Sequence, residues 1–384
     1  MESIDDTFRY SLNRSGELKK IVIRIILIIN IILAGLMIIS SLSVYISPEK
    51  IWYLAFLGLI FPYILIINIL FLVFWVIFKK RYFLISLLVI ILSWNNLGKF
   101  IQFNLFKSKP PADEVVVKLL SYNVRLFNYY NWLQIKSAHE DILTFIRKEN
   151  ADLVCLQEFL TLEDNKFSED SIKELLYLNP YIHIYYTDVA SNKRSLGIAT
   201  YSSFPIVNKG VIKFADSRNA SIFSDIKIND DTVRIYNCHL QSTQLRKKDY
   251  HFLDSIIFNY NTRRLTEIKD ISKRLKDAYL KRARQVNILS SHIENSPYPS
   301  MVCGDFNDTP VSYTYSKLRG KLKDAYLETG TGIGNTYFGS FPSFRIDYIL
   351  HSRSLTTLNF KTIRIRLSDH YPIICHFFLN KRDR

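Results

Sequence analysis

The chain has 384 residues, of which 48% are hydrophobic and 14% aromatic, and its formal net charge is +15. This length leaves room for a large core and for more than one structural unit. The four cysteines all lie in apolar, strand-like runs without the paired spacing of a zinc site. This spacing argues against a zinc-ribbon or zinc-finger fold, and we expect the cysteines to pack in a core.

The apolar residues are concentrated in about the first 110 positions, and the rest of the chain has the composition of a soluble domain. Residues 107–114 read Lys-Ser-Lys-Pro-Pro-Ala-Asp-Glu, and this mixture of charge and proline favours an extended linker over a continued helix. We therefore expect an N-terminal membrane anchor over residues 1–106, a linker over 107–114 and a soluble, catalytic domain over 115–384.

Two apolar runs, residues 25–46 and 51–78, are long enough to cross the ~30 Å hydrocarbon layer of a bilayer. A third run, residues 82–98, lies between Arg81 and Lys99 and is shorter. We expect it to be a third span, with a re-entrant or surface helix as the alternative. The length of the first run, and the second run that follows at once, argue against a cleavable signal peptide.

Positive charge predicts the orientation of these runs. Lys79, Lys80 and Arg81 fill the second loop, and five further basic residues precede the first run. By the positive-inside rule, the N-terminus and the second loop lie in the cytoplasm. Three spans then place the soluble domain outside the cytoplasm, in the periplasm if the membrane is a bacterial inner membrane, whereas two spans leave it inside. We expect the three-span arrangement.

The positive charge of the soluble part is concentrated in one segment. Residues 241–285 carry 12 basic and 5 acidic residues. The pattern in this segment is largely helical, and it suits either a solvated helix face or a surface for polyanions, such as phospholipid headgroups or nucleic acid. The sequence does not separate these two interpretations.

The start of the soluble part predicts a strand, a helix and a second strand. Residues 115–125 form an apolar run that ends near Asn123, and residues 151–158 form another that ends at Glu158. Between them, residues 138–149 carry apolar side chains at helical spacing. This is a βαβ-like pattern, which places a polar site at the carboxyl edge of the sheet.

Further strands are predicted at residues 195–202, 205–207, 233–240 and 301–307. Because side chains alternate along a strand, Asn237 and His239 share one face, and Asp305 and Asn307 point together with Phe306 buried between them.

Three polar clusters near the C-terminus, residues 304–308, 345–348 and 368–370, each follow or open a short apolar run. Together they hold carboxylates, an amide and a histidine. Metal-assisted phosphoester hydrolysis needs such groups, since hard oxygen ligands hold a divalent cation and charged groups position a water against phosphorus.

The order of these motifs is more specific than any one of them. The series is Tyr122-Asn123, Gln157-Glu158, Asn237-Cys238-His239-Leu240, Gly304-Asp305-Phe306-Asn307, Arg345-Ile346-Asp347-Tyr348 and Ser368-Asp369-His370. From about residue 115 to 379 the chain resembles the endonuclease/exonuclease/phosphatase (DNase I-like) superfamily, and among its members the membrane-anchored bacterial ones. The resemblance implies a four-layer α/β sandwich of two mixed β-sheets flanked by helices, preceded here by the transmembrane segment.

The resemblance also implies a metal site. It assigns Glu158 as the principal ligand, and Asn123 and Asp369 as residues that help to hold the metal or its waters. The expected cofactor is Mg²⁺, with Mn²⁺ as a substitute. The resemblance does not decide whether the site binds one metal ion or two.

The same resemblance assigns five catalytic residues. Asp305 orients or deprotonates the attacking water, and Asn307 hydrogen-bonds the phosphoryl group. His370 contacts a phosphoryl oxygen or transfers a proton, and Asp347 holds its tautomer. His239 lies across the phosphate as a second donor.

These expectations describe a membrane-anchored, divalent-metal-dependent phosphoester hydrolase, either a nuclease or an enzyme acting on phospholipid headgroups. A non-catalytic module that binds polyanions or the membrane surface is the alternative. Arg282 and Gln285 match an Arg-x-x-Gln of relatives, and we expect them to be structural.

Overall fold

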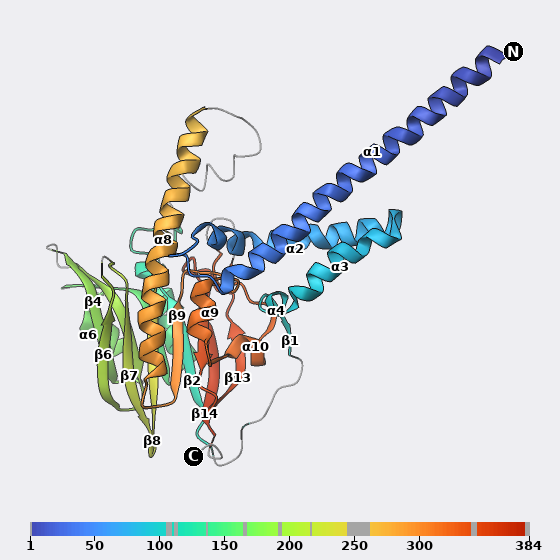
Figure 1. Cartoon of the computed structure of the whole chain (residues 1–384). Helices are drawn as coiled ribbons and strands as arrows, with labels where there is room; N and C mark the ends of the chain where they lie inside the picture. Colours follow the sequence, from blue (N-terminus) through green and yellow to red (C-terminus); the bar gives the residue numbers. More distant parts are fainter. Residues whose placement is uncertain are drawn as a thin grey trace.

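The computed structural model describes residues 2–104, 110, 114–135, 137–163, 167–190, 194–215, 217–243, 262–338 and 344–380. These residues form two six-stranded sheets packed face to face, helices on the outer faces, and an N-terminal helical unit (Figure 1). Most of the expected linker and residues 244–261 of the expected insertion lie outside the described residues.

The first sheet has the strand order β13-β14-β2-β3-β5-β4. Its strands are β2 (Val117–Asn123), β3 (Leu153–Leu162), β4 (Tyr181–Ala190), β5 (Arg194–Ser202), β13 (Leu355–Thr362) and β14 (Ile373–Leu379). Strands β2 and β3 are parallel, and the expected crossover helix joins them as α5 (Ala138–Glu149). Its apolar face is buried on the sheet, and its carboxyl end is capped by left-handed Asn150. The short helices η3 (Arg125–Asn128) and α6 (Glu169–Leu175) accompany this sheet.

The second sheet has the strand order β10-β12-β9-β8-β7-β6. Its strands are β6 (Ile206–Lys213), β7 (Ala220–Ile228), β8 (Asp231–His239), β9 (Ser300–Asp305), β10 (Lys323–Asp324) and β12 (Asp347–His351). Strands β8 and β9 are parallel. The described part of the connection between them is one long helix, α8 (Thr262–Glu294), and α9 (Tyr313–Arg319) and α10 (Ala325–Thr329) follow β9.

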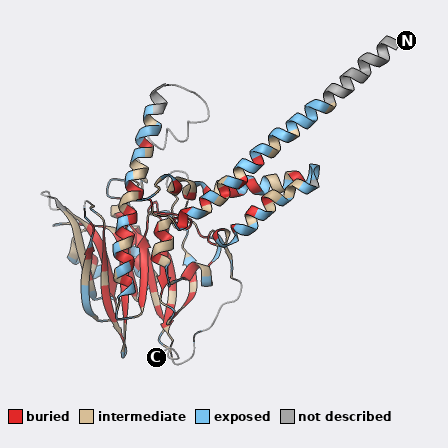
Figure 2. Ribbon diagram, viewed as in Figure 1, coloured by how far each residue is buried: buried red, intermediate tan, exposed pale blue. Residues whose placement is uncertain are grey.

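Apolar side chains fill the space between the sheets. Figure 2 shows that much of the central strands is buried. Cys155, Cys303 and Cys375 belong to this core, and Cys238 packs in the layer between the second sheet and α8. All four are buried free thiols, so the expected core role of the cysteines is confirmed. The four-layer α/β sandwich is confirmed as well.

The N-terminal unit begins with two long apolar helices. Its elements are α1 (Glu2–Ser41), η1 (Leu42–Val44), α2 (Tyr53–Phe78), η2 (Lys80–Tyr82), α3 (Phe83–Leu92), α4 (Trp94–Leu97) and β1 (Ile101–Phe103). Residues 16–44 and 53–78 are long and apolar enough to cross a membrane. The expected third span is divided at Ser93 into α3 and α4, and the chain runs back along α2 so that Phe100 stacks on Phe61.

The interior of this helical unit combines an apolar core with buried polar side chains, and its outer surface is apolar. Asn30, which is fully buried, donates to Ser86 at 2.9 Å and accepts from the Trp75 indole at 2.8 Å. Asn68 is also fully buried and donates to the carbonyl of Ile64. The exposed side chains of α1 and α2 are mostly Ile, Leu, Val and Phe, and Figure 2 shows α1 largely exposed.

The N-terminal unit is docked on the second sheet and its helices. The Ser43 hydroxyl donates to the carbonyl of Val311 at 3.1 Å, and Glu49 pairs with Arg284 of α8 at 3.1 Å. A Cβ atom at Gly58 would collide with the Val311 carbonyl, so the close approach of α2 requires glycine. Further along, β1 pairs with β11 (Thr331–Ile333) in an antiparallel ladder.

Candidate active site

The ends of three neighbouring strands bring three predicted site residues side by side. His239 is the last residue of β8, Asp305 is the last of β9, and Asp347 is the first of β12. In the ladders, Asp305 pairs with His239 on one side and with Asp347 on the other. Asp305 therefore sits between a histidine and a carboxylate at the carboxyl edge, which we define as the edge where β2, β8 and β9 end.

Asn123 joins the two sheets at this edge. It is the last residue of β2, and its amide donates to Asp305 Oδ2 at 3.0 Å and to Glu158 Oε1 at 3.2 Å. Its own Oδ1 accepts from the backbone N–H of Arg125 at 3.0 Å. In this arrangement Asn123 acts as a hydrogen-bond donor that holds two carboxylates together.

Glu158 reaches the edge through an irregularity in β3. The ladder between β3 and β5 shifts register between Leu156 and Phe159, and Glu158 has a φ of 49°. A bulge re-aims a side chain, and a left-handed non-glycine residue costs on the order of 1–3 kcal/mol. Partial burial and the nearby Asp369 carboxylate raise the pKa of Glu158.

The backbone after β9 turns sharply. Gly304 has a φ of 127°, and a Cβ atom there would collide with the carbonyl of Cys238, so only glycine suits this position. Asn307 is left-handed, with a φ of 54°. The strand consequently ends at Asp305, two residues earlier than expected, while Phe306 is buried as expected and stacks on Tyr348 at 4.8 Å.

Asn307 closes back on Asp305. Its backbone N–H donates to Asp305 Oδ1 at 2.8 Å, and its side-chain amide donates to Oδ2 at 3.0 Å and to the carbonyl of Leu240 at 2.9 Å. Burial raises the pKa of Asp305 to about 7, although the neighbouring His370 and the Asn307 N–H oppose the shift. Near neutral pH this carboxyl group can therefore exchange a proton.

His370 is held by Asp347. Its Nδ1 lies 2.9 Å from Asp347 Oδ2, and its Nε2 lies 3.7 Å from Asp305 Oδ2. Burial alone would lower the pKa of His370, but the carboxylates of Asp347 and Asp305 outweigh it and raise the pKa well above the usual value. His370 is accordingly the cationic imidazole of the site.

His239 is the neutral imidazole. Burial, and then the charge on His370, lower the pKa of His239 to about 3. Its Nε2 is buried without a hydrogen-bond partner among the described residues, 3.7 Å from Glu158 Oε1 and 3.9 Å from Asp305 Oδ2. The two histidines thus face the shared Asp305 carboxylate in opposite protonation states.

The donor set suits a divalent cation. Asp305 and Asp347 offer carboxylate oxygens that lie within 4.8 Å of each other, and the Glu158 carboxylate adjoins Asp305 through Asn123. Burial is the main cause of the raised pKa values of Glu158 and Asp305, and a bound cation would favour the charged forms of both groups. Clustered carboxylate oxygens are the ligands that Mg²⁺ and similar hard cations prefer.

Asp369 lies near Glu158, and it pairs with an arginine that the sequence interpretation did not assign. Arg125 Nη1 pairs with Asp369 Oδ2 at 3.2 Å, and its guanidinium stacks on Trp132 at 4.7 Å. Arg125 lies two residues after Asn123 in a run of left-handed residues through Asn128. The position of Arg125 two residues after a candidate metal ligand was the only feature of the sequence that could have marked it as a site residue.

Arg282 and Gln285 of α8 hold the loops that carry the site residues. Gln285 Oε1 accepts from the backbone N–H of Gln241 at 2.8 Å. The fully buried Arg282 donates to the carbonyl of Gln241 at 2.7 Å and pairs with Asp308 at 3.3 Å. These contacts join the segments that follow His239 and Asn307.

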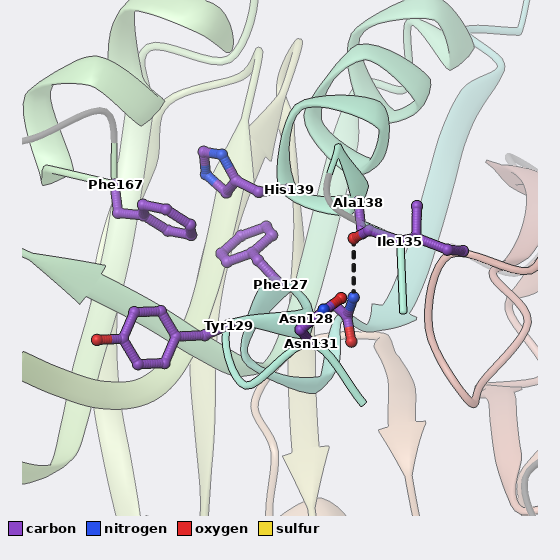
Figure 3. A pocket seen from close by; sticks show the side chains of 8 residues that line it. All are labelled: Phe127, Asn128, Tyr129, Asn131, Ile135, Ala138, His139 and Phe167. Carbon is purple, nitrogen blue, oxygen red and sulfur yellow. Dashed lines mark hydrogen bonds between the residues drawn. The ribbon is translucent and has the colours of Figure 1, made fainter. Parts of the chain in front are cut away.

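A cavity of about 250 Å³ lies between η3, the start of α5 and Phe167 (Figure 3). Its lining is Phe127, Asn128, Tyr129, Asn131, Ile135, Ala138, His139 and Phe167. Asn128 donates to the carbonyl of Ile135 at 3.2 Å across its floor. Aromatic side chains dominate its walls, and none of the predicted site residues lines it.

The family model for the endonuclease/exonuclease/phosphatase family matches residues 120–370, which is most of the chain. The chain belongs to this family. A second model, for a domain of unknown function, matches residues 23–100, and no curated protein sequence gives a match. Members of the family generally use divalent metal ions, and membership indicates a phosphoester hydrolase of the nuclease and phosphatase type.

Solved structures show the same fold. An endonuclease/exonuclease/phosphatase from Beutenbergia cavernae has 15% identity and a TM-score of 0.52, covering 69% of this chain and 72% of its own. A family protein from Bacteroides thetaiotaomicron has 17% identity and a TM-score of 0.50, covering 70% of this chain and 99% of its own. All eight predicted site residues of this family member lie at one edge of the sandwich, and their individual roles remain predictions.

Proposed function

We propose that the chain is a membrane-anchored, Mg²⁺-dependent phosphoester hydrolase with Asp305 at the centre of its chemistry. The observation that supports this most strongly is the convergence of Asn123, His239, Asn307 and His370 on one carboxyl group whose pKa is about 7. In the hydrolysis, water adds a hydroxyl group to phosphorus, the bond from phosphorus to the leaving oxygen breaks, and the proton of water passes to that oxygen.

The chain's own residues divide this work. Asp305 accepts a proton from the attacking water, and cationic His370, oriented by Asp347, stabilises the charge that develops on the phosphoryl oxygens. Neutral His239 and the Asn307 amide lie on either side of Asp305 and orient the phosphoryl group. A divalent cation, held by Glu158 with Asp305, Asp369 and Asn123 around it, would supply the remaining neutralisation of phosphate charge and activation of water.

The apolar outer surface of the N-terminal unit and the hydrogen bonds between its helices support membrane insertion. Asn30 donates to Ser86 of α3 and Asn68 donates to the carbonyl of Leu33 of α1, while Ile28, Leu70 and Ile77 are 57%, 62% and 68% exposed. In water these side chains would be a large apolar surface, and in a bilayer they would face lipid. The core helix of a soluble protein is mostly buried. In the most apolar stretches of residues 16–44 and 53–78, only 17% and 28% of the residues are buried.

The arrangement of the helices favours the three-pass orientation. Phe100, after α4, lies against Phe61 near the start of α2, whereas Lys79 and Arg81 lie at the opposite end of the unit. With the positive-inside rule, that opposite end is cytoplasmic and the catalytic domain is extracytoplasmic, in a bacterial inner membrane. A reporter that is active only in the periplasm, fused at Arg384, should give signal, and signal from a cytoplasmic reporter would contradict the orientation.

The test of the activity uses the full chain in detergent with a soluble chromogenic phosphodiester. EDTA should abolish turnover, and Mg²⁺ or Mn²⁺ should restore it. Glu158→Ala should be inactive at every metal concentration, whereas Asp230→Asn, a carboxylate change in the exposed turn between β7 and β8, should match the wild type. Full turnover in chelator, or in Glu158→Ala, would contradict the proposal. Vesicle or nucleic-acid binding without turnover would instead support the non-catalytic module.

A further inference from the structure

Helix α8 continues well beyond the sheet that it covers. Its carboxyl-terminal half packs on β8 and β9 through Val286, Leu289 and Ile293. Arg282 and Gln285 are level with the carboxyl edge, because they bond to Gln241, which follows β8. The preceding residues 262–281 therefore extend past that edge by about 30 Å, at 1.5 Å per residue. Figure 1 shows this projection, which we call the α8 arm.

The apolar helices leave the domain from the same edge as the α8 arm. Ser43, at the end of α1, bonds to Val311, four residues after Asn307. At the base of the arm, Tyr279 packs on Phe56 at 5.5 Å, and Lys276 lies over the Trp52 ring at 5.0 Å. The connection between α1 and α2 is thus wedged between the arm and the loop that carries Asn307.

The α8 arm is basic. Residues 262–281 contain seven lysines and arginines against three acidic residues. Lys269 and Lys273, one turn apart, are exposed. A basic helix beside an inserted helical unit suits an anionic bilayer surface, because its lysines attract the headgroup phosphates.

From this geometry we infer that the carboxyl edge faces the bilayer, that the α8 arm lies against its headgroups, and that the substrate is a phosphoester of a lipid headgroup in the same membrane. The inference rests on the proposed membrane insertion and phosphoester hydrolysis. A phosphate that reaches Asp305 must approach from the edge that the helices and the arm share. Headgroup phosphates occupy that layer at high local concentration, whereas a nucleic acid would have to enter between the domain and the membrane.

The orientation can be tested without any activity. The full chain is reconstituted in vesicles of phosphatidylcholine, phosphatidylethanolamine and phosphatidylglycerol, with a fluorophore on Lys269→Cys or on Lys148→Cys. Lys148 lies at the carboxyl end of α5, which leads into the start of β3 at the opposite edge of the sandwich, and it is also exposed. Headgroup-labelled quencher lipids should quench the fluorophore at position 269 several-fold more than at 148. Equal quenching at both positions would overturn the orientation.

The substrate class is tested in the same vesicles by measuring headgroup release. Lipid should be cleaved in vesicles that contain the protein and not in separate vesicles without it. Lys269→Glu with Lys273→Glu should reduce this release about tenfold at low salt. The matched control, Arg147→Glu with Lys148→Glu at the opposite edge, should not change it, and neither pair should affect a soluble phosphodiester.

The outcomes separate the two levels of the proposal. Turnover of the soluble ester with no lipid release, or with faster cleavage of DNA, overturns the lipid substrate and leaves the hydrolase intact. No turnover of any ester overturns the proposed function itself. Equal lipid cleavage in both vesicle populations shows that the membrane-facing edge does not select the substrate.

Discussion

The N-terminal helical unit and the catalytic sandwich bury polar groups for opposite reasons. In the helical unit, Asn30 bonds to Ser86 and Trp75, and apolar side chains face outward. In the sandwich, apolar side chains fill the centre, and the buried carboxylate of Asp305 and the imidazole of His239 are gathered at one edge. Asn30, Ser86 and Trp75 bond to one another in the first region, whereas in the second Asp305 retains charge and His239 Nε2 has no partner among the described residues, so that a metal and a phosphate can use both groups.

The largest expected effect concerns the retained charge at the sandwich edge. Asp305→Asn and His370→Ala should each lower kcat/KM for a soluble phosphodiester by ~10² to 10³-fold, about 2.7–4 kcal/mol of transition-state stabilisation. Because the buried Asp305 carboxylate has a raised pKa, Asp305→Asn should leave the thermal midpoint unchanged or raise it. A variant that loses activity only in proportion to lost folded protein would show a structural role instead.

Two exposed isoleucines test whether the helical unit is surrounded by lipid and the sandwich by water. Ile28 of α1 is 57% exposed and Ile288 of α8 is 48% exposed. If α1 is in a bilayer, Ile28→Asp should destabilise the inserted protein by about 2.5–3.5 kcal/mol, as expected for a charge in a membrane helix. Ile288→Asp should change the free energy of unfolding by no more than about 0.5 kcal/mol. Unfolding in bicelles measures both, and equal effects would contradict the membrane assignment.

The stability contributed by buried hydrogen bonds can be compared at Asn237 in the sandwich and Asn30 in the helical unit. Asn237 accepts from Gln157 at 2.7 Å and donates to the carbonyl of Ala199 at 2.8 Å between the sheets. Asn237→Leu should cost about 2–3 kcal/mol, because it leaves those partners buried and unpaired. Asn30→Leu should cost only about 0.6–1.7 kcal/mol, the range for interhelical bonds in membranes. Chemical denaturation of each variant in the same bicelles gives the two values, and a reversed order would contradict the contrast.

The smallest effect is a pH dependence within the sandwich. Burial, and then Lys209, lower the pKa of His183 to about 4, below the ordinary value of 6.5. Below pH 6.5 the unfolded chain binds a proton that folded His183 does not, so its contribution to stability falls as the pH drops from 6.5 to about 4. The loss should be about 1–2 kcal/mol. Urea midpoints at pH 7 and 4.5 should differ less in His183→Gln than in the wild type.

Local patterns predicted much of the architecture correctly. The helical spacing of residues 138–149 predicted α5, and the apolar runs before Asn123 and Glu158 predicted the parallel pair β2 and β3. The order of the motifs predicted the family and the four-layer sandwich. The third apolar run was less well described, because Ser93 interrupts its helix and tertiary contacts of Phe100 and β1 draw its end onto the domain.

The sequence identified the candidate site residues, but it did not predict which of them contact one another. The sequence by itself determined the element types, the family and the eight candidate site residues, because periodicity and motif order are local properties of the chain. The tertiary structure alone decided that Asp305 lies between His239 and Asp347, that Arg125 pairs with Asp369, and that the α8 arm shares an edge with the apolar helices. These depend on strand register and helix docking, which join residues far apart in the chain and leave no mark in any short segment.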